Sequence, residues 1–149
     1  MRFRQVFLSV ALALFSIVML GGCRLVFEPD VDAVSRMMAS MPTGETRVVR
    51  ELCDGEEVCK QLATLATLIR SEWYGKVKDF YDIELVEVAE DTGYSYVHVN
   101  LHLPGYGHVK ATRMPLVFEM ERIKFRWHIY DVDGLDEYLR RAERARGIL

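Results

Sequence analysis

The sequence of 149 residues lacks the short motifs that identify several enzyme classes. It has no Gly-x-Ser-x-Gly, no P-loop and no His-Glu-x-x-His, and it contains no internal repeat or low-complexity tract. It also has no excess of positive charge, because 19 Lys and Arg face 22 Asp and Glu. A nucleic-acid-binding domain would need a basic face. We therefore expect a protein that is not an enzyme and that has no catalytic residues, no metal site and no nucleic-acid partner.

Long apolar runs are also scarce, and the one at the start of the chain predicts export. It extends from Val6 to Leu20, which is too short for a comfortable transmembrane helix of about 20 residues. Arg2 and Arg4 precede it, and Leu20-Gly21-Gly22-Cys23 follows it. A basic start, an apolar stretch and small residues at the cleavage point are typical of a secretory signal peptide.

The residues Leu20-Gly21-Gly22-Cys23 resemble the lipobox of bacterial lipoproteins. The resemblance implies cleavage before Cys23, with diacylglycerol on its sulfur and an N-acyl chain on its amino group as the only non-protein groups. Two or three acyl chains anchor a protein stably to a membrane. In such lipoproteins the residue after the cysteine influences sorting, and because Arg24 stands there and not aspartate, the resemblance favours the outer membrane over the inner one. An ordinary signal peptide with an incidental cysteine and an uncut membrane anchor are the alternatives.

Cleavage there would divide the chain into a signal peptide (1–22), a lipidated tether (23–29) and one domain (30–149). The 127 residues after the cut suit a single compact domain. Among them only Cys53 and Cys59 are cysteines, and an even pair in an oxidising compartment predicts a disulfide. A redox-active pair would more often be Cys-x-x-Cys beside a basic group, and two cysteines alone support a metal site still less.

The first part of the domain has helical periodicity. We expect a helix from Asp30 or Asp32, either of which would cap it, through Met41, whereas Val48–Cys53 suits either a helix or a strand. A capping box of Asp54 and Glu57 predicts a helix that ends near Gly75. Its apolar stripe comprises Val58, Leu62, Leu65, Ile69 and Trp73.

Alternation with a period of two then predicts four strands. The first changes parity near Leu85 and Val86, which indicates a bulge, and Asp91-Thr92-Gly93 predicts the turn after it. A last helix, capped by Asp131 or Asp133, should extend from Leu135 to about Arg146. The inward faces of the later strands are expected to be Val97, Val99, Leu101 and Leu103; Met114, Leu116, Phe118 and Met120; and Ile123, Phe125, Trp127 and Ile129.

Short turns between strands imply an antiparallel sheet, and the whole predicts an α+β fold with N-terminal helices on a curved four-stranded sheet and a C-terminal helix. From Asp30 to Asp131 this order resembles the cystatin-like superfamily, in particular the nuclear transport factor 2-like domains. Small lipoproteins of that kind commonly end their last strand in a pattern like Trp127-His128-Ile129-Tyr130-Asp131. The resemblance implies a cavity between sheet and helices, and some relatives are isomerases or hydratases. The charged helix after Asp133 departs from it.

Three groups of residues are candidates for binding, each beside a purely structural interpretation. A polar-face site would combine His98, Asn100 and His102 with Lys124, Arg126 and His128, although His98 and His102 lie about 13 Å apart, too far for one metal ion. Otherwise these residues form a solvated sheet face. The arginines of the last helix either suit its C-terminal dipole or contact anionic headgroups or an acidic partner. These are Arg140, Arg141, Arg144 and Arg146. Tyr94, Tyr96 and Tyr106 form either a contact surface or half-buried packing.

Taken together, the sequence predicts a lipid-anchored protein outside the cytoplasm that acts without catalysis as a protein-binding or scaffold component of the cell envelope. A second hypothesis is a domain with a cavity for a hydrophobic small-molecule ligand. A third is a small cavity enzyme of the isomerase or hydratase kind.

Overall fold

The computed structural model describes residues 28–89 and 93–147, so the predicted signal peptide (1–22), the lipidation site Cys23 and most of the tether (23–29) lie outside the described residues. Among the described residues, no helix has both the length and the apolar character needed to cross a membrane. The elements are helices α2 (Asp30–Ser40), α3 (Thr46–Leu52) and α4 (Glu56–Arg70), the 3-10 turn η2 (Tyr74–Lys76), strands β1 (Tyr81–Ala89), β2 (Tyr94–Leu103), β3 (Thr112–Ile123) and β4 (Arg126–Asp133), and helix α5 (Leu135–Ala145).

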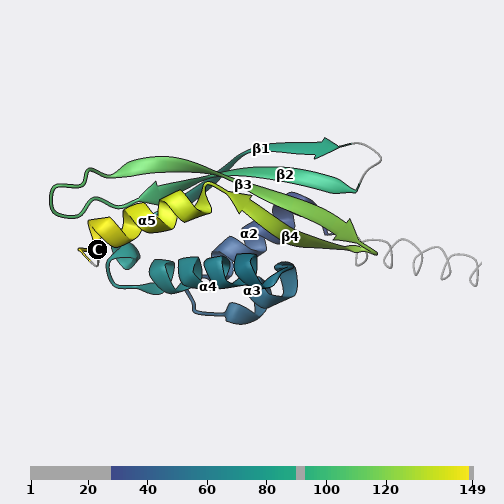
Figure 1. Ribbon diagram of the computed structural model, residues 1–149, viewed down its shortest axis with the longest axis horizontal. Coiled ribbons are helices and arrows are strands. Elements are labelled where there is room, and N and C mark those ends of the chain that lie inside the picture. The colour runs from purple at the N-terminus through teal and green to yellow at the C-terminus, as the bar shows by residue number, and fades with distance from the viewer. Residues whose placement is uncertain (1–27, 90–92, 148–149) are drawn as a thin grey trace, which may run out of the picture.

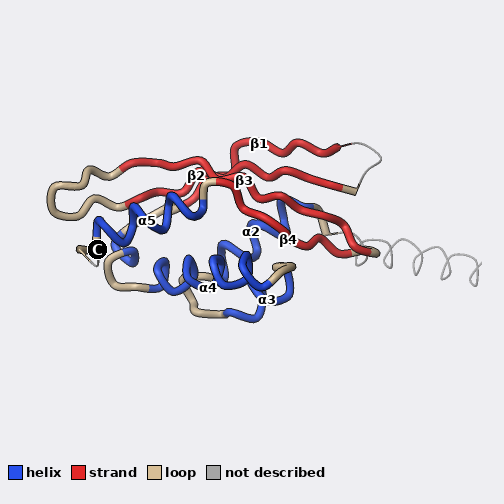
Figure 2. The backbone as a smooth tube through the Cα atoms, in the orientation of Figure 1, coloured by secondary structure: helices blue, strands red, loops and turns tan. Residues whose placement is uncertain are grey.

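The fold is α+β, as predicted. The strands form one antiparallel sheet in the order β1-β2-β3-β4, so each strand pairs with its neighbours along the chain. Figures 1 and 2 show all the described helices on one side of this sheet. The sheet therefore has an inner face that is covered by helices and an outer face that no described helix covers.

The hydrophobic core lies between the helices and the inner face of the sheet. Burial in β2 alternates strictly, which confirms the predicted inward face of that strand. The stripe of α4 is buried as predicted from Val58 to Ile69, and Trp73 packs partly buried against the core. The ambiguous segment Val48–Cys53 is helical as far as Leu52, where α3 turns Val48, Val49 and Leu52 toward the same core, and Cys53 follows in an extended conformation.

Three predicted helix caps are wrong. Asp54 does not cap α4; Gly55 occupies that position, and the Asp54 N–H donates to the carbonyl of Ile129 at 2.8 Å. Pro29 precedes α2 in place of an aspartate, and no side chain caps that helix. The buried Asp30 instead accepts a hydrogen bond from Ser95 of β2. The Asp30 side chain thus makes a tertiary contact in place of a local cap.

The junction between β4 and α5 also differs from the prediction. Gly134, and neither Asp131 nor Asp133, stands at the N-terminal cap of α5, with φ of 83°. A Cβ there would lie 2.9 Å from the carbonyl oxygen of Pro115. Only glycine therefore combines this left-handed backbone with so close an approach to β3.

Strand pairing departs from simple alternation in two places. A register shift between Ile83 and Leu85 confirms the irregularity predicted for the first strand. The inward face predicted for the fourth strand is wrong at its start, since Ile123 and Phe125 are 41% and 61% exposed. Ile123 is the last residue of β3 and Phe125 lies in the β3–β4 turn. At this turn the sheet extends beyond the helices that cover its core.

The predicted disulfide is present between Cys53 and Cys59, with a Cα–Cα distance of 5.3 Å. It joins the end of α3 to the first turn of α4. The backbone of Cys53 also pairs with that of Ile129, as an isolated β-bridge at the outer edge of β4. The bond therefore ties the helical layer to one edge of the sheet.

Candidate functional site

The six residues of the predicted polar-face site do not form one cluster. His98, Asn100 and His102 lie half-buried on the outer face of β2, as expected. His98 is in register with Val117 of β3, whereas His128 is in register with Glu121, four residues further along the same strand. That separation is about 13 Å.

The two basic members of the predicted site lie at the β3–β4 turn. Lys124 occupies the turn itself and Arg126 begins β4; both are exposed. Among the described residues, no group of three or more His, Cys, Asp or Glu is arranged to hold a metal ion.

The structure instead brings tyrosines and carboxylates together at one end of the outer face. Tyr94 and Tyr96 of β2 are in register with Glu121 and Glu119 of β3. Tyr130 joins them from β4, with its ring centroid 6.1 Å from that of Tyr94 in an edge-on arrangement. We call these five residues the tyrosine cluster. An open hollow of about 490 Å³ lies among Tyr94, Tyr96, Glu121 and Tyr130.

Tyr130 joins this cluster because Glu121 pairs with His128 and Met120 with Ile129, which brings the next residue of β4 beside Glu119. Glu119 pairs with Asp131, but the next residue, Met120, pairs with Ile129, so Tyr130 is the extra residue of β4. Ile129 and Val132 on either side are buried. Alternation places Tyr130 on the same face as His128, but it does not show how β4 is aligned with β3. The sequence pattern therefore identified Tyr94 and Tyr96 as candidates but neither Tyr130 nor the two glutamates.

The chemistry of the tyrosine cluster favours cations. Burial, followed by the neighbouring Glu119 carboxylate and Tyr96, raises the pKa of the Tyr130 hydroxyl, which keeps its proton near neutral pH. The faces of phenol rings attract ammonium and guanidinium groups. Carboxylates such as Glu121 accept charge-assisted hydrogen bonds from the same groups. An Arg or Lys side chain therefore fits this hollow better than an anion does.

The arginines predicted as a patch on the last helix are partly neutralised. Arg140 and Arg141 form ion pairs with Glu137 at 2.9 and 2.7 Å. The hydrogen bond from Arg141 is the main cause of the lowered pKa of the Glu137 carboxyl. Arg144 and Arg146 are exposed near the C-terminal end of α5. Figure 1 shows that end at the opposite side of the molecule from the β3–β4 turn.

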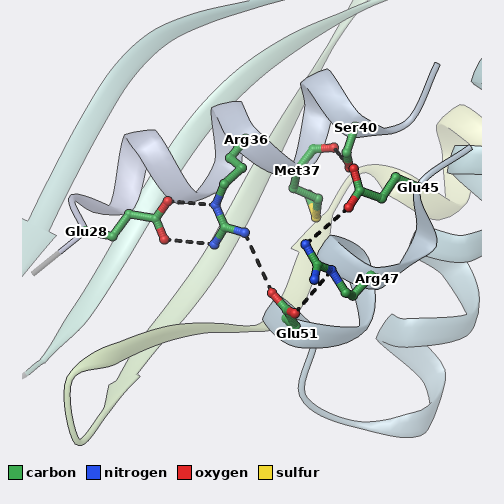
Figure 3. Close-up of polar contacts among 7 residues, drawn as sticks. All are labelled: Glu28, Arg36, Met37, Ser40, Glu45, Arg47 and Glu51. Carbon is green, nitrogen blue, oxygen red and sulfur yellow. Dashed lines mark hydrogen bonds and ion pairs between the residues drawn. The ribbon is translucent and has the colours of Figure 1, made fainter. Parts of the chain in front are cut away.

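A second hollow lies beside the β3–β4 turn, next to the first described residues of the chain. This groove of about 480 Å³ is lined by Glu28, Arg36, Glu51, Leu52, Phe125, Arg126 and Trp127. Arg36 hydrogen-bonds both carboxylate oxygens of Glu28, at 2.8 and 2.9 Å, and lies 3.8 Å from Glu51 (Figure 3). The Glu28 hydrogen bond is the main cause of the raised pKa of Arg36. Glu51 also pairs with Arg47 at 3.6 Å.

The space in which the resemblance places a ligand cavity is occupied by fully buried side chains, among them Met37, Met38, Leu65 and Phe118. No protein-family model, curated protein or solved structure matches this chain. The resemblance of residues 30–131 to the nuclear transport factor 2-like domains therefore stays a prediction.

Proposed function

We propose that this protein is a lipid-anchored component of the bacterial cell envelope that binds a protein partner without catalysis. The lipid on Cys23 would hold it to a membrane, with the outer membrane favoured by Arg24. The tyrosine cluster would be the contact surface, and its partner would present Arg or Lys side chains. The observation that carries this proposal is the open hollow in which three tyrosines and a carboxylate converge on a sheet face that no described helix covers.

Two further observations support the proposal. Tyrosine is enriched at protein interfaces, because its ring offers a large contact area and its hydroxyl a hydrogen bond. The Cys53–Cys59 disulfide suits an oxidising compartment, such as the bacterial periplasm, better than the cytoplasm.

The lipid anchor is tested by metabolic labelling with a palmitate analogue and mass spectrometry of the full chain. The wild-type protein should carry label and should lack residues 1–22. Cys23→Ala should carry no label and should keep the full precursor mass. A Cys53→Ala/Cys59→Ala variant is the matched control and should be labelled like the wild type. Label that persists in Cys23→Ala would refute the anchor.

The partner surface is tested by purifying the lipidated protein from membranes in mild detergent and measuring the stoichiometry of whatever co-purifies. Combining Tyr94→Ala with Glu121→Arg should reduce partner recovery by about ten-fold or more, since central interface residues commonly contribute 2 kcal/mol or above. Tyr106→Ala is the control, because Tyr106 is 55% exposed but belongs to the β2–β3 loop. Equal partner loss in both variants would contradict the assignment. Recovery of the protein alone with a small molecule would contradict the scaffold function.

A further inference from the structure

The β3–β4 turn has an unusual composition for an exposed turn. Ile123 and Phe125 are 41% and 61% exposed, and they alternate with the exposed basic residues Arg122, Lys124 and Arg126. We call residues 122–126 the hairpin tip. Turns that face only water are usually polar, and a cluster of exposed large apolar side chains commonly marks a contact surface.

The backbone of the hairpin tip adds a second observation. Lys124 has φ of 59°, in the left-handed region that glycine or asparagine normally occupies in a two-residue hairpin turn. This backbone conformation is strained for lysine, and glycine would remove the strain. The turn nevertheless has a charged side chain at this position. Below the tip, Trp127 packs against the core and Arg122 lies over its ring, 5.7 Å from the centroid. These contacts of Trp127 and Arg122 hold the hairpin in place directly below the tip.

The hairpin tip lies beside the point where the described chain begins. Glu28 lines the same groove as Phe125 and Arg126. Only four residues separate Cys23 from Glu28 in the sequence, and a fully extended chain between their Cα atoms spans at most about 18 Å. A lipid on Cys23 would thus hold this end of the domain near the bilayer, whereas the arginines at the end of α5 would lie at the far end (Figure 1).

Charge also favours this orientation. No acidic residue occurs between Arg122 and His128, although Glu121 directly precedes the tip and the whole chain has net charge −3. The nearest carboxylates of the groove, Glu28 and Glu51, already pair with Arg36 and Arg47. An anionic membrane surface would attract the tip and repel the acidic remainder of the domain.

We propose that the hairpin tip inserts into the anionic leaflet that holds the lipid anchor. Ile123 and Phe125 lie among the upper acyl chains, and Arg122, Lys124 and Arg126 contact lipid phosphates. The tip then fixes the orientation of the domain, with the arginines of α5 facing away from that membrane. This inference rests on the proposed anchor at Cys23.

The test uses the full lipidated protein in vesicles of phosphatidylethanolamine and phosphatidylglycerol, with brominated lipids as short-range fluorescence quenchers. Phe125→Trp places a reporter in the tip at an exposed position. Tyr106→Trp is the matched control, since Tyr106 is 55% exposed, close to the 61% of Phe125, but lies in the β2–β3 loop. The brominated lipids should quench the fluorescence of Phe125→Trp more than that of the wild type, which contains only Trp73 and Trp127. The fluorescence of Tyr106→Trp should be quenched no more than that of the wild type. Adding Lys124→Glu and Arg126→Glu should reduce the membrane-bound population of the tip by about ten-fold or more.

The outcomes separate the tip from the anchor. A lipidated protein that floats with the vesicles but shows equal quenching in both tryptophan variants, or none above wild type, overturns the role of the tip and leaves the anchor intact. A chain without lipid overturns both. Emission of Phe125→Trp that shifts with protein density, but is not quenched by brominated lipid, places the tip against a second copy and overturns insertion.

Discussion

Raising the pH above about 10 should destabilise the domain steeply, by up to about 1.4 kcal/mol per pH unit for each of two buried tyrosine hydroxyls. Tyr74 and Tyr138 are 1% and 0% exposed, and their hydroxyl oxygens lie 2.6 Å apart. Both donate to the backbone carbonyl of His102, Tyr138 at 2.9 Å. Burial is the main cause of the raised pKa of each hydroxyl. The pair ties η2 and α5 to the end of β2.

The sign of this effect follows from the direction of the pKa shifts. A raised pKa means that the folded protein holds these two protons more tightly than the unfolded chain, in which tyrosine has a pKa of about 10. The stabilisation is therefore complete below pH 10 and is lost as the pH rises above it. Urea unfolding at a series of pH values measures the slope directly.

The matched control for this prediction is Tyr74→Phe/Tyr138→Phe. The double variant should be less stable than the wild type near neutral pH, because the hydrogen bonds to His102 are lost, by roughly 1–3 kcal/mol. Its stability should fall less steeply between pH 10 and 11.5, because the two buried hydroxyls are absent. Some loss should remain, since the other tyrosines and the lysines titrate in both proteins. Parallel curves for the two proteins would show that the pair does not cause the alkaline loss.

Phe118→Ala should lower the free energy of unfolding by about 3–5 kcal/mol. Phe118 is fully buried on the inner face of β3, where its cross-strand partners are Val97 of β2 and Val132 of β4. Removing its ring leaves a cavity that three strands and the helical layer cannot readily close. The change would be measured by urea unfolding with the disulfide intact.

The adjacent residue provides the control. Val117 is half-buried on the outer face, and Val117→Ala should cost less than about 1.5 kcal/mol. A similar loss for both variants would mean that β3 does not have one covered and one uncovered face. The comparison thus tests the arrangement on which the exposure of the tyrosine cluster depends.

Most of the fold could be predicted because its strongest signals are local. Burial in β2 follows the alternation of its sequence, and the α4 stripe follows helical periodicity. The predicted caps failed where a distant partner competes with a local one. The Asp30 side chain suits a cap but accepts a hydrogen bond from Ser95, and the backbone N–H of Asp54 donates to Ile129 of β4.

The candidate site was harder to predict, since it depends on how strands are aligned. Tyr94 and Tyr96 were identified from their own strand, whereas Tyr130 joins them through the alignment of β4 with β3, which the sequence of one strand does not show. Alternation also assigned Phe125 to the core, because the pattern continues through the turn although the covering helices do not.

The contact between Cys53 and β4 has a consequence for aggregation. The outer strands of an open sheet present unpaired backbone groups to which another chain can add. At the β4 edge, the Asp54 N–H donates a hydrogen bond to the carbonyl of Ile129, and the disulfide holds the segment Cys53–Asp54 in place. We expect that reducing that bond would let this segment move away and would open the edge of β4 to intermolecular strand addition. We therefore expect the disulfide to protect the β4 edge against intermolecular strand addition.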